Sequence, residues 1–372
     1  MGDHARRYRM GIDFLRFLRR FGMPEPVPLF LAPMAGVTDV AYRLLAKEAG
    51  ADFTATEFTA ASGLSRQDAK SWAKVETHPR ESPFIPQIFG GIEDEMVETA
   101  RLLSKDADVV DLNFGCPAPK VTKTCAGAAM MGEPDNLVRM VERCIEASDV
   151  PVSVKMRLGT NQDTLTVLEI AERCAELGVL RVCVHGRTLA QKYRGVADWD
   201  MIAKVVEVCE PYDTPVIANG DVVDSKSAAN CLEVTGAQGL MIGRAAIGDP
   251  CIFGRIKKEL GWEDFVAPWG ESNEAGQKHW AWNRYVELVD EIGGPYAARN
   301  MKQHAISFTK GLPGGRELRP YLHAIKDFRL IGEPLNLAFD GYSSRRHNTL
   351  AVPEAIAMAE GFKDIKFRRR NP

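Results

Sequence analysis

The chain has 372 residues, of which 45% are hydrophobic and 26% charged, and its formal net charge is −3. These values are ordinary for a soluble globular protein, and the net charge alone gives no sign of a polyanionic partner. Because single hydrophobic cores stop growing at roughly 250 residues, we expect one large domain and one smaller domain.

Positive charge gathers at both ends of the chain. Residues 1–22 hold six arginines against two aspartates, and residues 361–372 hold five lysines and arginines against one aspartate. Solvated tails and contacts to a polyanion both account for such patches.

The cysteines and the apolar runs limit the compartment and the metal chemistry. None of the eight cysteines forms a CxxC pair, so we expect no structural zinc or iron–sulfur site and no other metal. The sequence has no signal-peptide pattern and no apolar run of 18 residues, so we expect no membrane span. A cytoplasmic, reducing compartment fits these features best.

Short apolar runs alternate with amphipathic stretches over most of the chain. Strands are expected at residues 28–33, 51–56, 83–88, 109–112, 150–156, 180–184, 215–218 and 238–242. Helices are expected after them at residues 38–49, 60–69, 93–103, 134–147, 164–177, 199–208, 225–235 and 250–260. This alternation predicts an α/β fold with a parallel sheet, and eight units favour a closed (β/α)8 TIM barrel. An open doubly wound sheet is the alternative.

The strand pattern stops near residue 261. Residues 277–292, 296–310 and 316–330 have helical patterns, and the sequence GLPGG at 311–315 predicts a tight connector. We therefore expect three parts: a basic N-terminal segment at 1–27, a barrel at 28–260, and a C-terminal helical domain with a basic tail at 261–372.

The most informative stretch is residues 108–121, DVVDLNFGCPAPKV. A buried strand stops at Asn113, Gly115 allows the backbone to turn, and Pro117 prevents a regular continuation. The thiol of Cys116 is thus expected on a rigid loop at the carboxyl end of a parallel strand, where ligands bind. The alternative is that Cys116 is a small buried hydrophobe, as most free cysteines are.

Polar or loop residues follow nearly every expected strand. They are Pro33, Met34 and Ala35; Gln87; Asn113 and Cys116; Lys155 and Arg157; His185 and Arg187; Asn219, Gly220 and Asp221; and Gly243 and Arg244. Each has an ordinary structural explanation alone. Together they are expected to meet at one mouth of the barrel, because the carboxyl ends of parallel strands share one face.

The last two of these loops indicate a phosphate site. Residues 218–221 and 242–245 place glycine-flanked backbone N–H groups after the seventh and eighth strands, where such barrels commonly bind phosphate. Arg244 could pair with phosphate oxygens, Lys155 could stabilise negative charge on a reduced flavin, and Gln87 and Asn113 could bond ring amide edges. FMN satisfies these requirements together.

Nine stretches of the chain resemble the tRNA-dihydrouridine synthase family. They are APMAGVTDVAYR, PFIPQIFGG, DLNFGCPAPKV, AGAAMM, VSVKMRLG, VHGRTLAQKYRGVADWDMI, ANGDV, GRAAIGDPCIFGRI and, in the helical part, MKQHAISFTKGLPGGRELR. The resemblance runs from about residue 29 to residue 329 in the order of the family. Its most specific part is NFGCPAPKV together with HGRT and GRAA.

The resemblance implies reduction of the carbon 5–carbon 6 double bond of particular uridines in tRNA, with FMN as cofactor and NADPH or NADH as donor. It implies these roles: Cys116 as proton donor; Pro33, Met34, Ala35, Gln87, Lys155 and His185 around the isoalloxazine; Asn219, Gly220, Asp221, Gly243 and Arg244 at the phosphate; and Asn113, Lys155 and Arg187 near a flipped uracil. Seven basic residues against two acidic ones between residues 296 and 329 would offer a surface for tRNA phosphates.

Two other functions remain open at this stage. An FMN-dependent TIM-barrel oxidoreductase acting on a free pyrimidine or on dihydroorotate would share the phosphate loops without needing the basic helical part. A non-enzymatic RNA-binding scaffold fits poorly, because the barrel mouth is rich in reactive groups. We infer no obligate protein partner from the sequence. The sequence leaves open the uridine position in tRNA, the preferred nicotinamide donor and the oligomeric state.

Overall fold

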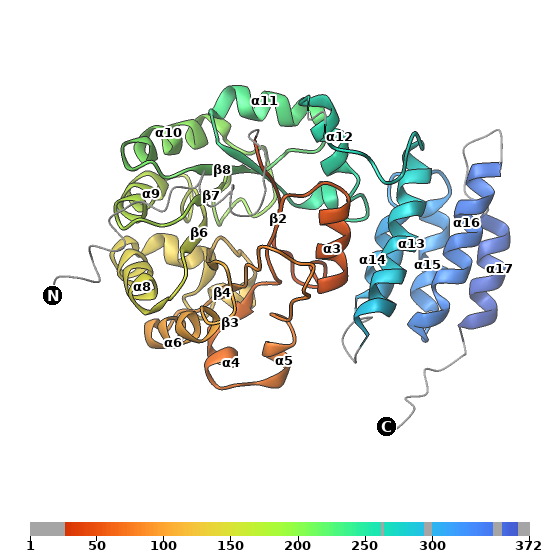
Figure 1. Ribbon diagram of the computed structural model, residues 1–372, viewed down its shortest axis with the longest axis horizontal. Coiled ribbons are helices and arrows are strands. Elements are labelled where there is room, and N and C mark those ends of the chain that lie inside the picture. Colours follow the sequence, from red (N-terminus) through yellow and green to blue (C-terminus); the bar gives the residue numbers. More distant parts are fainter. Residues whose placement is uncertain (1–26, 262–263, 294–299, 345–351, 364–372) are drawn as a thin grey trace.

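The structure, a computed structural model, describes residues 27–261, 264–293, 300–344 and 352–363 (Figure 1). Nearly all of the expected basic N-terminal segment and the tail from residue 364 lie outside these residues. The described chain forms a strand-and-helix body followed by a stack of helices, as Figure 1 shows from red to blue.

Nine parallel strand segments form the centre of the first body. Their bounds are β1 Leu29–Leu31, β2 Phe53–Thr54, β3 Thr59–Ala60, β4 Gln87–Phe89, β5 Val110–Phe114, β6 Val152–Arg157, β7 Val182–His185, β8 Val216–Asn219 and β9 Gly239–Ile242. Their order in the sheet is β2-β1-β9-β8-β7-β6-β5-β4-β3. This curled parallel sheet confirms the TIM-barrel prediction, because β3 to β9 pair in succession, β9 pairs with β1, and β1 pairs with β2.

The second barrel strand, predicted as a single run over residues 51–56, is interrupted in the structure. It is divided into β2, which pairs with β1, and β3, which pairs with β4. Between them, the Thr56 N–H donates to the carbonyl of Ile85 at 3.0 Å, and the Gln87 N–H donates to the Thr56 hydroxyl at 3.0 Å. The chain changes strand partners at this point, so the second barrel position consists of β2 inside the expected run and β3 beyond it, and these two segments are the two edges of the sheet.

A helix follows each barrel position. These helices are α3 Val40–Glu48, α4 Ala61–Ser65, α6 Glu93–Leu103, α8 Pro134–Ala147, α9 Val167–Glu176, α10 Trp199–Cys209, α11 Ser225–Thr235 and α12 Ile252–Glu259. The expected helix at 60–69 is instead α4 followed by α5 (Ala69–Trp72). Gln67 has a φ of 57°, which ends α4, and the Asp68 carboxylate accepts the Ser71 N–H at 2.9 Å and so caps α5.

The barrel has two separate apolar cores. A small interior core includes Phe30, Phe53, Ile217 and Met241, whereas the larger core lies between the strands and the helices. The separation follows from strand geometry, because alternate side chains point to opposite faces of the sheet. On the inward face of β5 that alternation places Asp111 and Asn113, both buried, where apolar residues would be usual.

Five helices follow the barrel in the described part of the chain. They are α13 Glu274–Ile292, α14 Met301–Phe308, α15 Gly315–Ala324, α16 Gly332–Ser344 and α17 Val352–Phe362. The first three correspond to the helices expected at 277–292, 296–310 and 316–330. The sequence analysis identified no elements after residue 330, so α16 and α17 are additional. None of the described helices combines the length and the apolar character that crossing a membrane requires.

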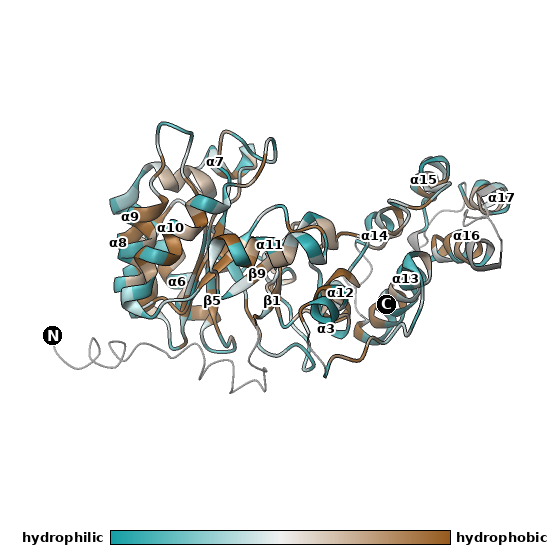
Figure 2. Cartoon of the chain, turned by 90° about the horizontal axis from the view of Figure 1, so that it is seen from above, coloured by the Kyte–Doolittle hydropathy of each residue, from teal (hydrophilic) through white to brown (hydrophobic). Residues whose placement is uncertain are grey.

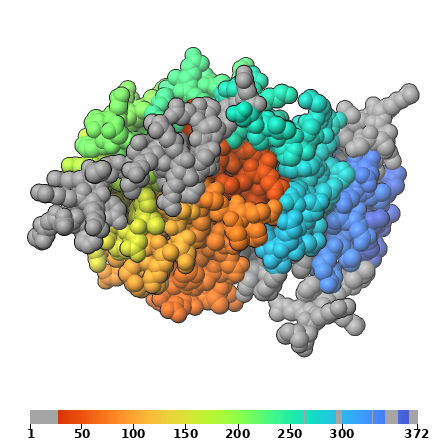
Figure 3. All heavy atoms as spheres, in the orientation of Figure 1, coloured from red at the N-terminus to blue at the C-terminus, as the bar shows by residue number. Residues whose placement is uncertain are grey.

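Helices α13 and α14 pack against α3 and the loops at its ends (Figures 2 and 3). The carboxylate of Asp39, which caps α3, lies 3.1 Å from the Tyr285 hydroxyl and 2.9 Å from Asn300 Nδ2. The Tyr42 ring stacks on His304 at 4.4 Å, and its hydroxyl accepts the Gly248 N–H at 3.2 Å. Tyr42 of α3 therefore contacts both α14 and the loop that follows β9.

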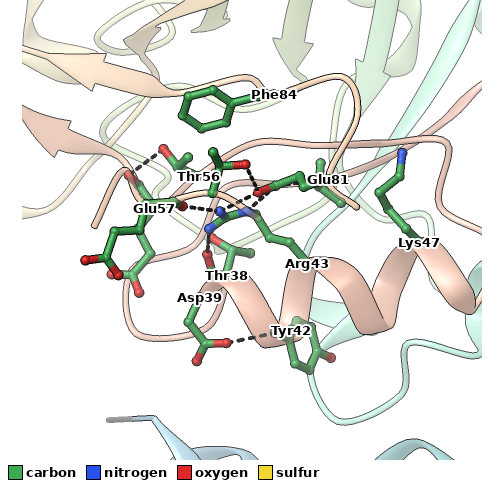
Figure 4. Close-up of polar contacts among 12 residues, drawn as sticks. Thr38, Asp39, Tyr42, Arg43, Lys47, Thr56, Glu57, Glu81 and Phe84 are labelled. Atoms are coloured by element: carbon green, nitrogen blue, oxygen red, sulfur yellow. Dashed lines mark hydrogen bonds and ion pairs between the residues drawn. The ribbon is translucent and has the colours of Figure 1, made fainter. Parts of the chain in front are cut away.

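A fully buried ion pair fixes α3 to the loop before β4 (Figure 4). Arg43 Nε and Nη2 donate to the two carboxylate oxygens of Glu81, with the Nη2 contact at 2.8 Å, and neither side chain is exposed. Arg43 also donates to the carbonyls of Thr38 and Glu76, at 2.8 and 2.7 Å. The Thr77 hydroxyl donates to Glu81 at 2.8 Å, so both charges are well hydrogen-bonded.

Candidate active site

The predicted site residues meet at the carboxyl ends of the barrel strands. Asn113 on β5 is the register partner of Lys155 on β6, and His185 on β7 is the partner of Asn219 on β8. Gln87 on β4 lies on the other side of β5, where its side chain bonds that of Asn113. The strand register therefore places these five side chains around one mouth.

The Cys116 loop is held by hydrogen bonds to the side chain and main chain around it. Asn113 Oδ1 accepts the N–H groups of Gly115 and Cys116, at 3.0 and 2.9 Å. The Cys116 carbonyl accepts the Ala128 N–H at 3.0 Å. A Cβ atom on Gly127, whose φ is 58°, would lie 2.8 Å from that carbonyl oxygen, so only glycine fits there. These contacts hold the loop at both the Asn113 side chain and the Ala128 main chain.

The Cys116 thiol is nearly buried, with 7% of the residue exposed. Phe58, Phe89 and Val121 are among the apolar side chains around it. Burial raises the pKa of the Cys116 thiol, and this outweighs the opposite effects of the Ala118 N–H and of nearby cations. The thiol therefore carries its proton at neutral pH, which suits a proton donor rather than a nucleophile.

A buried cation lies beside the thiol loop. Lys155 is 9% exposed, and its Nζ donates to Asn219 Oδ1 at 2.9 Å. The Asn219 amide is held in turn, because its Nδ2 donates to the Met241 carbonyl at 2.7 Å. Burial lowers the pKa of Lys155, and its hydrogen-bond partner is a neutral amide. A negatively charged ligand group at this position would relieve that cost.

Arg187, His185, Asp221 and Arg244 form a second cluster at the mouth. Arg187 is 1% exposed, and its Nη2 lies 2.8 and 2.7 Å from the two oxygens of Asp221. Its Nη1 lies 3.3 Å from His185 Nε2, while Arg244 Nη2 lies 3.3 Å from Asp221. Burial and the surrounding cations lower the pKa of His185, so the imidazole is neutral.

Asp221 faces two arginines, and this sets its charge. Burial alone would raise the pKa of Asp221. The hydrogen bonds from Arg187 and from the Ala197 N–H outweigh burial and lower that pKa. The carboxylate is thus ionised, and the two arginines balance its negative charge. Its main-chain N–H group is the part of Asp221 suited to an anionic ligand.

Glycine is required at Gly220 in the first of the two predicted phosphate loops, and Gly243 in the second lies beside the loop after β1. Gly220 has a φ of 118°, and a Cβ atom there would lie 2.8 Å from the Ala197 Cβ and 3.0 Å from His185 Cδ2. A Cβ on Gly243 would lie 3.9 Å from the Met34 sulfur, so the loops after β1 and β9 are adjacent. Pro33 and Met34 are half-buried beside this position and Ala35 is exposed.

Two features of the mouth escaped the sequence analysis. Tyr193 is 54% exposed and lies against two guanidinium groups, with Arg157 Cζ at 5.6 Å and Arg244 Cζ at 5.2 Å from its ring centre. Its loop position gave no pattern that could have identified it. Arg157, whose pKa burial lowers to about 10, donates to the Gly115 carbonyl at 2.7 Å and so braces the thiol loop.

Asp111 is the second feature of the mouth, after Tyr193, that the sequence did not reveal. It carries no catalytic pattern in the sequence, but its spacing of two from Asn113 indicates that both face the barrel interior. Gln87 Nε2 donates to its Oδ2 at 2.6 Å. Among the described residues, the structure shows no group of three or more His, Cys, Asp or Glu side chains arranged to hold a metal ion.

Comparison with known families identifies this arrangement. The model of the family described as "Dihydrouridine synthase (Dus)" matches residues 30–336. The chain belongs to the dihydrouridine synthase family. Members of this family are oxidoreductases, and the protein is therefore an enzyme of this class.

Individual relatives agree with the family match. A Rhizobium leguminosarum bv. phaseoli protein named "Probable tRNA-dihydrouridine synthase" is 40% identical over 275 residues, which cover 74% of this chain and 82% of the relative. A Rhodobacter capsulatus protein of the same name is 39% identical over 235 residues, 63% of this chain and 72% of the relative. A Treponema pallidum protein, also of that name, is 34% identical over 77% of this chain and 85% of its own.

Proposed function

We propose that the protein reduces the carbon 5–carbon 6 double bond of specific uridines in tRNA to dihydrouridine. The family match and the relatives' names support this substrate. The observation that carries the chemistry is the nearly buried Cys116 thiol, whose pKa burial raises, on a hydrogen-bonded loop near Lys155. Such a thiol is a competent acid for a carbon atom that becomes enolate-like.

The residues at the mouth fit FMN as the cofactor. Gly220 packs tightly against Ala197 and His185 at a positive φ, Arg244 is half-exposed, and Lys155 is a buried cation bonded to a neutral amide. We propose that Asn219, Gly220, Asp221, Gly243 and Arg244 hold the phosphate, and that Pro33, Met34, Ala35, Gln87, Lys155 and His185 surround the ring. When bound, FMN supplies the hydride that is added to carbon 6 of the uracil, after reduction by NADPH or NADH.

The chain's own side chains complete the reaction. The Cys116 thiol gives its proton to carbon 5, so that hydride and proton together saturate the double bond, and solvent then returns a proton to the thiolate. Asn113, Lys155 and Arg187 would lie near the uracil, which must leave its base stack to enter the mouth. Pairing with Asp221 holds Arg187 in place for this role.

The proposed division of labour places FMN in residues 28–260 and tRNA contacts mainly in residues 261–372, in a cytoplasmic protein. The rival substrate, a free pyrimidine or dihydroorotate, is separated by an anaerobic test with the reduced holoenzyme. We expect tRNA to reoxidise the flavin, and free uracil and orotate to leave it reduced. Reoxidation by the small molecules alone would favour the rival.

The purified protein is expected to be yellow and to release FMN, not FAD. The neighbouring glycine loops at Gly220 and Gly243 are proposed to hold one phosphate group together, and the chain has no GxGxxG fingerprint for a dinucleotide at a strand–helix turn. Chromatography of the cofactor released by heat checks this. Release of FAD, or an apoprotein without affinity for FMN, would contradict it.

Arg316→Ala and Arg319→Ala are expected to weaken tRNA binding while flavin reduction by the nicotinamide donor stays intact. Arg316 is exposed on α15, and Arg319 is half-buried with its Nε 3.1 Å from the Thr309 hydroxyl. Each lost phosphate contact should make the salt dependence of binding shallower by about one unit of slope. Lys105→Ala, an exposed lysine between α6 and β5, is the control. Parallel loss of tRNA binding and flavin reduction would instead indicate misfolding.

The tRNA half-reaction is expected to slow at alkaline pH. An acid must be protonated to act, and burial raises the pKa of the Cys116 thiol, so the rate should stay constant until the pH exceeds that of an ordinary cysteine pKa and then decrease. Stopped-flow traces of flavin reoxidation by tRNA across the alkaline range measure this. A rate that rises through the same range would contradict Cys116 as the acid.

A further inference from the structure

A continuous chain of buried hydrogen bonds runs from the barrel interior to the thiol loop. Asp111 Oδ2 accepts from Gln87 Nε2 at 2.6 Å, and Gln87 Oε1 accepts from Asn113 Nδ2 at 2.7 Å. Asn113 Oδ1 then accepts the backbone N–H groups of Gly115 and Cys116. Asp111, Gln87 and Asn113 are each at most 5% exposed, so water does not substitute for any of these partners.

The groups at the two ends of this series of hydrogen bonds fix which atoms donate and which accept. The backbone N–H groups of residues 115 and 116 can only donate, so the oxygen of the Asn113 amide must face them. Its nitrogen therefore faces Gln87, whose own nitrogen then faces Asp111. An ionised carboxylate can only accept, so it is the group that matches this order at the other end.

The carboxylate of Asp111 is paired with a buried guanidinium group. Its Oδ1 accepts from the Ser153 hydroxyl and lies 3.2 Å from Arg181 Nη2. The side chains of Arg181 and Asp111 are each only 2% exposed. Arg181 Nε and Nη1 have no hydrogen-bond partner among the described residues, so the contacts that this guanidinium makes there are those to Asp111 and to the Phe30 ring, whose centre lies 5.1 Å from Arg181 Cζ.

We propose that Asp111 is a positioning residue, which sets the orientation of the Gln87 and Asn113 amides and through them the placement of the Cys116 thiol. The importance of that placement for catalysis rests on the proposed function. An amide at position 111 can donate as well as accept, so the Gln87 amide could turn over. Asn113 would then present its nitrogen to two N–H donors, and both bonds that hold the thiol loop would be lost.

A simpler role for Asp111 is to neutralise Arg181. That role predicts lower stability on substitution but no change at the thiol loop, so the test needs a measurement at Cys116 itself. The rate of Cys116 alkylation by iodoacetamide as a function of pH supplies one without tRNA or turnover. It is measured in a Cys125→Ser background, because Cys125 is exposed while the other six cysteines are buried.

Asp111→Asn is expected to speed the alkylation of Cys116 and to lower the pH of its midpoint, because the released loop exposes the thiol. Flavin reoxidation by tRNA should slow about 10- to 100-fold, the scale of a reacting group misplaced by about 1 Å. Asp108→Asn is the matched control, since Asp108 lies three residues earlier and accepts the Phe84 N–H at 2.9 Å outside this chain of bonds. It should leave the alkylation profile at the wild-type position.

Two further variants keep the proposal open to contradiction. Asn113→Ala should expose the thiol by itself, and adding Asp111→Asn to it should have no further effect, because residues acting through one another are not additive. Gln87→Met breaks the chain of bonds but keeps the charge of Asp111, and it should reproduce the faster alkylation even if Asp111→Asn does not fold.

A wild-type alkylation profile in Asp111→Asn or Gln87→Met would overturn the positioning role. So would effects of Asp111→Asn and Asn113→Ala that simply add. These outcomes are distinct from failure of the proposed function, which would appear as a wild-type enzyme whose reduced flavin is not reoxidised by tRNA.

Discussion

Cys116→Ala is expected to slow the reoxidation of reduced flavin by tRNA about 10²- to 10⁴-fold, the usual contribution of a positioned general acid. FMN binding and flavin reduction by the nicotinamide donor should stay near normal, because neither step needs the thiol proton. Cys116→Ser should fall between alanine and wild type, since a hydroxyl keeps the geometry but is a far weaker acid. Stopped-flow traces of the two half-reactions measure each step separately.

The alternative for Cys116 is a packing role among Phe58, Phe89 and Val121. It predicts the opposite pattern, in which Cys116→Ala costs some stability and spares the tRNA half-reaction. Cys125→Ala serves as the control, because this exposed cysteine lies on the same loop and should leave both half-reactions unchanged. A normal rate of reoxidation by tRNA in Cys116→Ala would remove Cys116 from the mechanism.

Glu81→Gln is expected to lower the free energy of unfolding by about 3–5 kcal/mol, the usual cost of removing one partner of a buried ion pair. The Arg43 guanidinium is fully buried and would keep its charge without the carboxylate that Nε and Nη2 now contact (Figure 4). The contacts of Arg43 to the Thr38 and Glu76 carbonyls would remain, but neutral acceptors do not offset a buried charge. Chemical denaturation followed by circular dichroism measures the loss.

An exposed pair provides the comparison for this prediction. Arg101 and Glu98 form an ion pair with about half of each side chain exposed, so Glu98→Gln should barely move the denaturation midpoint. If Glu81→Gln were as mild as Glu98→Gln, the Arg43–Glu81 pair would not be holding α3 in place. Its effect on FMN content should be secondary and should follow the loss of folded protein.

Much of the barrel could be predicted from the sequence because its signals are local. The helices at 93–103, 134–147 and 225–235 have the predicted bounds, since apolar periodicity runs along all three, Pro134 marks the start of the second, and Asp224 and Gly236 cap the third. Residues at the carboxyl ends of separate strands were expected to meet, and hydrogen bonds join Gln87 to Asn113 and Lys155 to Asn219. This expectation depends only on the strands being parallel and adjacent.

Features that depend on partners distant in the chain could not be predicted. The division of the second strand into β2 and β3 follows from pairing with β1 and β4 at opposite edges, which leaves no mark in the run around Thr56. The order of bonds from Asp111 to Cys116 needs the orientation of two amides, and Tyr193 is defined by the arginines that approach it. Such contacts are properties of the folded barrel.

The most direct test of the proposed function is the mapping of dihydrouridine in unmodified tRNA after incubation with the purified holoenzyme and NADPH. We expect particular uridines to gain two hydrogen atoms, detected by mass spectrometry of nuclease fragments, and to remain unchanged with Cys116→Ala over the same time. Unmodified tRNA, from a holoenzyme whose flavin is fully reduced by NADPH, would contradict the proposed function.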